Sequence, residues 1–275
     1  MEQSVEHESQ ATPSLGVAAF FDLDKTTIAT ASILAFSSTL REAGYIDTKL
    51  VARALWGRIV YKYIGADHER SEKMRSTAIR LTKGWQQDQV RALVTNGMEE
   101  VIDPIVYEEA IAEIRAHQAA GHLVFMVSAS PEEIVRPLSQ HLGADGAVAT
   151  IARVDSEGRY TGDVQFYSYG EGKVDAIEAL ALEHDLDLDR CYAYTDSITD
   201  LPMLEAVGHP IVVNPDRALM KVAEDRGWER RTFSNEVSLR DRVGDHAKTG
   251  AIVAGASAAI AGGTGLWLRS RRRQT

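Results

Sequence analysis

The sequence predicts an α/β fold, in which a parallel β-sheet carries helices on both faces and a helical unit is inserted into the chain. Three observations lead to this prediction. Short apolar runs of strand length alternate with helical patterns, as in βαβ units. Several of these runs end in acidic or hydroxyl residues. The first two clear strands are also separated by far more residues than one crossover connection needs.

The first strand is predicted from Val17 to Asp22, and Asp24 follows one position later. Ionised carboxylates are costly to remove from water unless they have a partner or a metal. In open α/β sheets, ligands bind at the carboxyl ends of strands. The acid pair therefore predicts a metal-assisted active site. The residues alone leave a second interpretation open, in which Asp24 is a helix N-cap and Asp22 is solvated.

A long helical stretch follows this strand. Asp22 and Ser128 lie 106 positions apart, whereas a βαβ unit takes roughly 30 residues. The helical patterns occur at residues 32–43, 48–64, 69–81, 87–96 and 104–120. We therefore expect a helical cap at residues 30–105, inserted into a catalytic core of residues 17–29 and 106–239.

The rest of the core alternates strands and helices. A continuous apolar run from Leu123 ends in the hydroxyl of Ser128, and a helix then opens with Pro131 and two glutamates. The elements expected after it are strands at 147–153 and 159–164 joined by a hairpin turn, a helix at 173–183, and strands at 190–195, 211–213 and 228–233.

Polar residues recur where these strands end and where one helix begins. Taken singly, each has a structural interpretation. Ser128 or Ser130 could cap a helix, Lys173 could be an exposed helix lysine, and Asp196 could cap a short helix that starts at Asp200. Because the carboxyl ends of parallel strands meet at one edge of a sheet, the same residues together with the first acid pair predict a single site.

In order and spacing, these residues resemble the haloacid dehalogenase-like (HAD) hydrolase superfamily. The four motifs that match are Asp22-Leu23-Asp24-Lys25-Thr26 for DxDxT, Val127-Ser128-Ala129-Ser130 for the strand that ends in a hydroxyl residue, Lys173 for the lysine, and Asp196-Ser197-Ile198-Thr199-Asp200 for DxxxD. The resemblance covers about Ala18 to Phe233 and implies a Rossmann-like, HAD-like core. A cap between the first and second motifs resembles the phosphoserine-phosphatase-like subgroup, subfamily IB.

The resemblance implies a phosphomonoester hydrolase that works through an aspartyl-phosphate. Asp22 would attack phosphorus as the nucleophile. Asp24 would protonate the leaving oxygen and later take a proton from water, as a general acid and base. Two alternatives stay open: a phosphotransferase that uses the same intermediate, and a non-catalytic scaffold that binds a membrane or a partner.

The resemblance also implies Mg²⁺ as cofactor. Its ligands would be Asp22, the backbone carbonyl of Asp24, and Asp196, while Asp200 would hold metal-bound water or the lysine. The phosphoryl oxygens would be bound by two further residues, Ser128 and Lys173.

Two positions depart from the family pattern. Lys25 stands where many relatives have glycine or serine, and its charge could tune phosphate binding or face solvent. Ala31 stands nine positions after the nucleophile, where phosphoserine phosphatases carry a glutamate that recognises the substrate amine. Phosphoserine is therefore not the expected substrate, and small-molecule and lipid phosphate esters both stay open.

Composition excludes several other functions. The chain has 275 residues, 44% hydrophobic and 25% charged, with a formal net charge of −10, so no nucleic acid partner is expected. Cys191 is the only cysteine, which excludes an internal disulfide and a multi-cysteine zinc site. Residues 1–16 are expected to be a disordered lead without a signal peptide, which indicates the cytoplasm.

The tail at residues 240–275 differs from the rest. Residues 249–268 carry no charge and are rich in Gly and Ala, and an arginine cluster follows them. A membrane span would place the arginines outside, against the positive-inside preference. Membrane contact through residues 249–268 and a flexible or self-packing tail are both compatible with this pattern.

Overall fold

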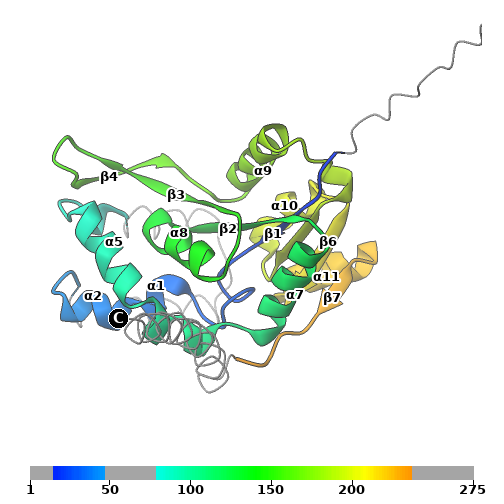
Figure 1. Cartoon of the computed structure of the whole chain (residues 1–275), viewed down its shortest axis with the longest axis horizontal. Helices are drawn as coiled ribbons and strands as arrows, with labels where there is room; N and C mark the ends of the chain where they lie inside the picture. The colour runs from blue at the N-terminus through cyan, green and yellow to red at the C-terminus, as the bar shows by residue number, and fades with distance from the viewer. Residues whose placement is uncertain (1–14, 47–78, 237–275) are drawn as a thin grey trace, which may run out of the picture.

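The computed structural model of the chain describes residues 15–46 and 79–236, which form a seven-stranded sheet in the order β4-β3-β2-β1-β5-β6-β7 (Figure 1). The strands are β1 (Ala18–Phe21), β2 (Leu123–Pro131), β3 (Gly146–Val154), β4 (Tyr160–Phe166), β5 (Tyr192–Thr195), β6 (His209–Val213) and β7 (Glu229–Arg231). Neighbouring strands are parallel except β3 and β4, which form an antiparallel hairpin. The predicted parallel sheet and its hairpin are confirmed.

Helices cover both faces of this sheet. The described α-helices are α1 (Ser32–Ala35), α2 (Ser37–Glu42), α5 (Gln87–Asn96), α6 (Met98–Val101), α7 (Glu108–Ala119), α8 (Glu132–His141), α9 (Glu171–Glu183), α10 (Leu201–Glu205) and α11 (Arg217–Arg226). Short 3₁₀ helices lie at Asp103–Ile105, Leu188–Arg190 and Ile198–Asp200. Buried side chains of α7 and α8 join one hydrophobic core, and those of α9, α10 and α11 join the other.

Strand β1 is fully buried between these two cores. Because side chains alternate along a strand, Phe20 points to one core and Phe21 to the other. The ring of Phe20 stacks on Phe125 at 5.8 Å, and that of Phe21 stacks on Tyr194 at 4.2 Å. Burying each ring stabilises the fold by about 1.5–3 kcal/mol. The strand is therefore a rigid support for whatever follows its carboxyl end.

The chain leaves the core after β1, and the segment that returns to the core pairs with the segment that leaves it. The amide of Ala29 donates to the carbonyl of Ile105 at 2.7 Å, and the amide of Tyr107 donates to that of Thr27 at 3.1 Å. Between them, the described elements are all helical. The predicted helix at 48–64 and most of that at 69–81 lie outside the described residues, so the cap at 30–105 stays a prediction.

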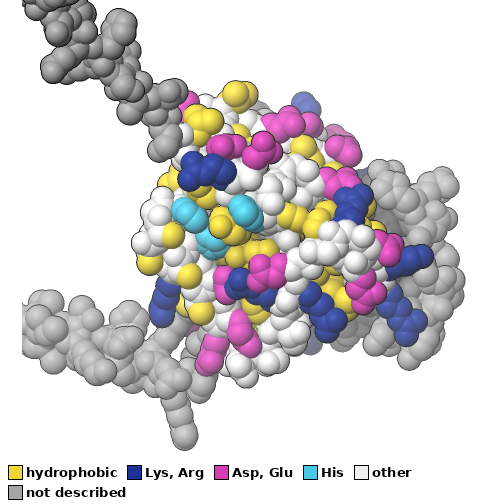
Figure 2. Space-filling model, turned by 90° about the vertical axis from the view of Figure 1, so that its right-hand side faces the viewer, with side chains coloured by type: hydrophobic (Ala, Val, Ile, Leu, Met, Phe, Trp, Pro, Cys, Tyr) yellow, Lys and Arg dark blue, Asp and Glu magenta, His cyan; other side chains and the backbone are white. Residues whose placement is uncertain are grey.

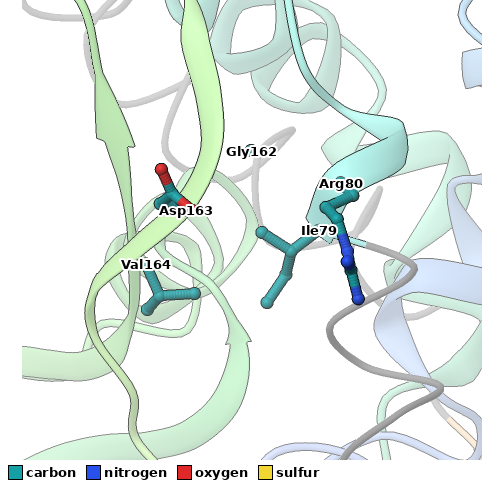
Figure 3. Close-up of a pocket in the computed structure, with 5 residues that line it drawn as sticks. All are labelled: Ile79, Arg80, Gly162, Asp163 and Val164. Atoms are coloured by element: carbon teal, nitrogen blue, oxygen red, sulfur yellow. The ribbon is translucent and has the colours of Figure 1, made fainter.

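The returning segment also contacts the β3–β4 hairpin, which extends past α5 in Figure 1. The amide of Gly84 donates to the carbonyl of Tyr160 at 2.8 Å, and that of Gln87 donates to Gly158 at 3.0 Å. Figure 3 shows a pocket beside this contact, lined by Ile79, Arg80, Gly162, Asp163 and Val164. These lining residues belong to none of the four motifs, so the pocket is distinct from the predicted site.

A group of histidine side chains lies on one face of the molecule (Figure 2). The rings of His209 and His122 stack on Tyr192, and Nε2 of His117 lies 2.8 Å from the hydroxyl of Tyr194. Burial, followed by the nearby His122, lowers the pKa of His117 to about 4. Tyr192 and His209 begin β5 and β6, so this group lies at the amino ends of the strands, opposite the edge where the acidic motifs end.

Three further predictions concern single segments. Cys191 is completely buried, as expected of a small apolar side chain. Within the described ranges, the helices lack the combination of length and apolar character that a bilayer crossing needs. The tail at 240–275, including 249–268, and nearly all of the lead at 1–16 lie outside the described residues.

Candidate active site

The predicted site residues meet at the carboxyl edge of the three central strands. β1 pairs with β2 on one side and with β5 on the other, so the direction of winding reverses at β1. Asp22 follows β1, Ser128 lies near the end of β2, and Asp196 follows β5. The register places Phe21 beside Met126 and Tyr194, which brings the residues that follow to one edge.

Asp22 is held by main-chain and side-chain contacts directly after β1. Its amide donates to the carbonyl of Tyr194 at 2.9 Å, which extends the β1–β5 ladder by one residue. The hydroxyl of Thr27 donates to its carbonyl at 2.7 Å, and that of Thr26 lies 3.4 Å from Oδ2. The residue is 7% exposed, which excludes the interpretation of a solvated Asp22.

Lys173 is buried between two carboxylates. Its ammonium donates to Oδ1 of Asp22 and to Oδ2 of Asp200, both at 2.7 Å. The residue is 1% exposed, so the interpretation as an exposed helix lysine is wrong. It lies in the first turn of α9, where a Cβ at Gly172 would overlap the carbonyl oxygen of Tyr167. Glycine at this position lets the start of α9 approach the sheet edge closely.

Asp200 contacts Lys173 and is shielded from solvent. Its Oδ2 also accepts a hydrogen bond from the hydroxyl of Thr195 at 2.8 Å, and it is 4% exposed. Asp196 does not cap the following helix, because the N-cap residue of α10 is Asp200 and that helix has no side-chain cap. Both acids are therefore available to the site.

Asp24 contacts the start of α1 without being its N-cap, which is Ala31. Its Oδ1 accepts the amide of Ser32 at 2.8 Å, at the start of α1, in the manner of a helix cap. Its Oδ2 accepts the hydroxyl of Ser130 at 3.1 Å. Asp24 is half-buried, beside the lysine-bound Asp22, so capping does not remove it from the site.

The end of β2 orients a hydroxyl toward the same edge. The amide of Ser130 donates to Oγ of Ser128 at 3.1 Å, and Ser128 is 2% exposed. Because that oxygen accepts from the main chain, the hydroxyl hydrogen of Ser128 is free to donate to a ligand. Neither serine acts as an N-cap: α8 begins after Pro131, without a side-chain cap.

Lys25 lies at the rim, and its side chain is 55% exposed. Its Nζ is 3.6 Å from Oδ2 of Asp196, so the charge faces the acids while the side chain contacts water. Its backbone has φ of 65°, the left-handed region that favours glycine. This conformation gives a physical reason for the glycine that many relatives carry at this position.

The site holds more buried negative charge than its one buried lysine balances. Burial raises the pKa of Asp22 to about 8, although Lys173 opposes this shift. Burial likewise raises the pKa of Asp24, and that of Asp196 to about 6. Burial alone would lower the pKa of Lys173, but the two carboxylates that it contacts raise it above its usual range. A further cation at the acids would relieve this excess.

The donor set fits Mg²⁺ rather than a softer metal. Two carboxylates, those of Asp22 and Asp196, and the carbonyl of Asp24 are all oxygen donors at one edge. Across the part of the chain that the structure describes, no three His, Cys, Asp or Glu side chains converge as a metal cage. An ion here would therefore keep several waters, which is usual for Mg²⁺.

Some residues of the site are absent from the prediction. Ser32 and Thr195 contact the acids directly, yet they lie outside the family motifs as matched. Thr195 had a local signal, because it is the last strand residue before Asp196. Ser32 had none, since its contact with Ser130 joins positions 98 residues apart.

Known proteins are similar to this chain in sequence. A model of the haloacid dehalogenase-like hydrolase family matches residues 19–205. A probable phosphatase of Mycobacterium tuberculosis is 48% identical over 231 residues, which cover 84% of this chain and 80% of that protein. A Streptomyces azureus protein named for inhibition of morphological differentiation is 45% identical over 262 residues, which cover 93% of this chain and 94% of that protein.

The fold is also shared with a solved structure. A substrate-bound phosphoserine phosphatase superposes with a TM-score of 0.57 at 21% identity, over 84% of this chain and 98% of that one. The family model spans more than half of the chain, and both relatives align over most of their length. The chain is therefore an enzyme of the haloacid dehalogenase-like hydrolase family.

Proposed function

We propose that this enzyme is a Mg²⁺-dependent phosphomonoester hydrolase that forms an aspartyl-phosphate on Asp22. The observation that carries the proposal is the buried Lys173 between Asp22 and Asp200, with Asp24 beside them. A phosphoryl group meets repulsion from an anionic nucleophile, so positive charge must be held at the site. The name of the Mycobacterium tuberculosis relative, a probable phosphatase, is consistent with this chemistry.

The carboxylate of Asp22 is oriented for attack. Its Oδ1 is bound by Lys173, which leaves Oδ2 with only the 3.4 Å contact to Thr26. In the first step, Asp22 forms a bond to phosphorus while the bond from phosphorus to the ester oxygen breaks, and Asp24 gives its proton to that oxygen. In the second step, Asp24 takes a proton from water as the water oxygen attacks phosphorus, and Asp22 is released.

The phosphoryl oxygens have donors on two sides. An ammonium has three N–H groups, and two of those on Lys173 are used by Asp22 and Asp200, so one is left for the phosphoryl group. Ser128 offers its hydroxyl hydrogen from β2. Mg²⁺, held by Asp22, Asp196 and the carbonyl of Asp24, would neutralise phosphoryl charge when bound.

The proposed substrate class is a small-molecule or lipid phosphate ester. Ala31, at the N-cap of α1, offers a methyl group where an amine-binding carboxylate would be needed. We therefore do not expect phosphoserine to be preferred. Membrane contact by the tail would favour a lipid phosphate ester. That contact stays a prediction, because the tail lies outside the described residues.

The test is Asp22→Asn on a panel of phosphate esters with Mg²⁺, compared with Asp175→Asn, which changes an exposed acid on the same helix as Lys173. We expect loss of at least 1,000-fold in kcat for the first variant, on the order of the loss seen for other nucleophiles, and wild-type rates for the second. Survival of activity in Asp22→Asn would overturn the proposal. Methyl phosphate formed in the presence of methanol would instead indicate the phosphotransferase alternative.

A further inference from the structure

Two serines, Ser32 and Ser130, meet across the carboxyl group of Asp24. Their hydroxyl oxygens lie 2.9 Å apart, and both side chains are buried, with exposed fractions of 0% and 9%. We propose that Ser32 and Ser130 are positioning residues that aim the Asp24 carboxyl at the leaving oxygen of the substrate. This inference rests on the proposed function, because it concerns how the proposed general acid is held.

The hydrogen bonds leave only one consistent direction when Asp24 is ionised. Ser130 donates its single hydroxyl hydrogen to Oδ2 of Asp24 at 3.1 Å, so it can only accept from Ser32. The chain of donors therefore runs from Ser32 to Ser130 to Asp24. Neither hydroxyl is left without a partner, which matters because an unpaired buried hydroxyl costs about 1–3 kcal/mol.

The two oxygens of Asp24 differ in what they can do. Oδ1 faces the backbone amide of Ser32 at 2.8 Å, and an amide can only donate, so this oxygen stays an acceptor. Oδ2 faces the hydroxyl of Ser130, which can donate or accept because its bond to Ser32 can run in either direction. Oδ2 is therefore the oxygen that can carry the transferable proton, and the hydroxyl of Ser130 occupies one of its two lone-pair positions.

The main chain and the side chain of Ser130 contact different residues, so the positioning of Asp24 can be tested apart from phosphate binding. Its amide donates to Oγ of Ser128, whereas its side chain contacts Asp24. Alanine at position 130 keeps the amide and removes only the hydroxyl. The variant should therefore leave the Ser128 contact in place and release Asp24 alone.

Ser32 ties the same carboxyl to the predicted cap. It is the first residue of α1, just beyond the paired crossing that joins the cap region to the core. Both its amide and its hydroxyl contribute, one to Oδ1 and one through Ser130 to Oδ2. Alanine at position 32 removes only the second contact, so we expect a smaller effect there than at position 130.

The test compares leaving groups, because a poor leaving group needs the proton and a good one does not. We expect Ser130→Ala to lower kcat/KM for phenyl phosphate by about 10-fold to 100-fold, a part of the roughly 100-fold to 10,000-fold that a general acid contributes, because the acid itself is kept. For 2,4-dinitrophenyl phosphate the loss should stay below about 3-fold, since that anion leaves unprotonated. Ser32→Ala should show the same selectivity at smaller size, and Ser130→Thr, which keeps a hydroxyl, should recover most of the phenyl phosphate rate.

Ser139→Ala is the matched control. Ser139 is also buried, but it lies on α8 and donates its hydroxyl hydrogen to the carbonyl of Gly146 on β3, away from the site. It should affect neither ester. Equal losses on both esters in Ser130→Ala and Ser32→Ala, or no loss on either, would overturn the positioning role while leaving the proposed function intact. A wild-type enzyme inactive toward both esters would overturn the proposed function, and this inference with it.

Discussion

Replacing Asp22 with asparagine should remove activity and, in the metal-free protein, make the fold more stable. The side chain is 7% exposed and shares one buried ammonium with a second carboxylate. Burial raises its pKa to about 8, from 3.8. Asparagine has the same shape and keeps an acceptor for Lys173. It carries no charge, so folding no longer removes a carboxylate from the water that solvates it in the unfolded chain.

The size of the effect follows from linkage. A group whose pKa is raised in the folded state contributes its full stability below the unfolded pKa and loses it as the pH rises through the folded pKa. For Asp22 that window runs from 3.8 to about 8. At 1.36 kcal/mol per pH unit, the loss at pH 7 is on the order of 4 kcal/mol, and at pH 5 it falls to on the order of 1–2 kcal/mol.

The assay is urea unfolding followed by circular dichroism, in EDTA, at pH 5 and pH 7. Asp22→Asn should have a free energy of unfolding above that of wild type at both pH values, with the larger difference at pH 7. Asp175→Asn should match wild type. If Asp22→Asn is no more stable than wild type at pH 7, the carboxylate is not destabilised by burial and the electrostatic account of the site is wrong.

Three further changes test other parts of the structure. Lys173→Met leaves the buried carboxylate of Asp200 without its cation and should lower the free energy of unfolding at pH 7 by about 3–5 kcal/mol; an unchanged urea midpoint would contradict the buried Lys173–Asp200 ion pair. Lys25→Gly should stay within about 1 kcal/mol of wild type, because relief of the left-handed backbone offsets the entropy of glycine. It should also bind Mg²⁺ more tightly by calorimetry, since no ammonium then faces Asp196; weaker binding would refute this competition. Because the pKa of His117 is lowered to about 4, its protonation should cost wild type on the order of 2 kcal/mol, measured relative to His117→Gln, as the pH falls from 6.5 to 4. His117→Gln should remove this loss, and an equal loss in both proteins would exclude His117 as its source.

Much of the site was predictable because its residues follow strands that could be identified from the chain alone. Asp22, Ser128 and Asp196 stand at the ends of apolar runs, and parallel strands bring such ends to one edge. Lys173 was predicted only through the family motif. Its local pattern favoured an exposed helix lysine, whereas the two carboxylates that it contacts lie 151 and 27 positions away along the chain.

The serine pair shows where prediction from sequence stops. Ser32 belongs to no motif, and its partner lies 98 positions away, so no periodicity marks it. The hydrogen bond from its amide to Asp24 depends on the paired crossing between residues 27–29 and 105–107, which sets the angle at which α1 begins. Contacts of this kind arise from packing between segments, and local patterns do not record them.

The sequence by itself determined the family and the sheet architecture of this protein. Strand-length apolar runs, their spacing and the four motifs predicted a parallel sheet with an acidic edge and an enzyme of this family. Only the tertiary structure decided how the charges are arranged: Lys173 between two acids, Asp24 between two serines, and Lys25 facing Asp196. The physical reason is that motifs specify which side chains are present, whereas burial and long-range packing determine which partners and how much water each one keeps.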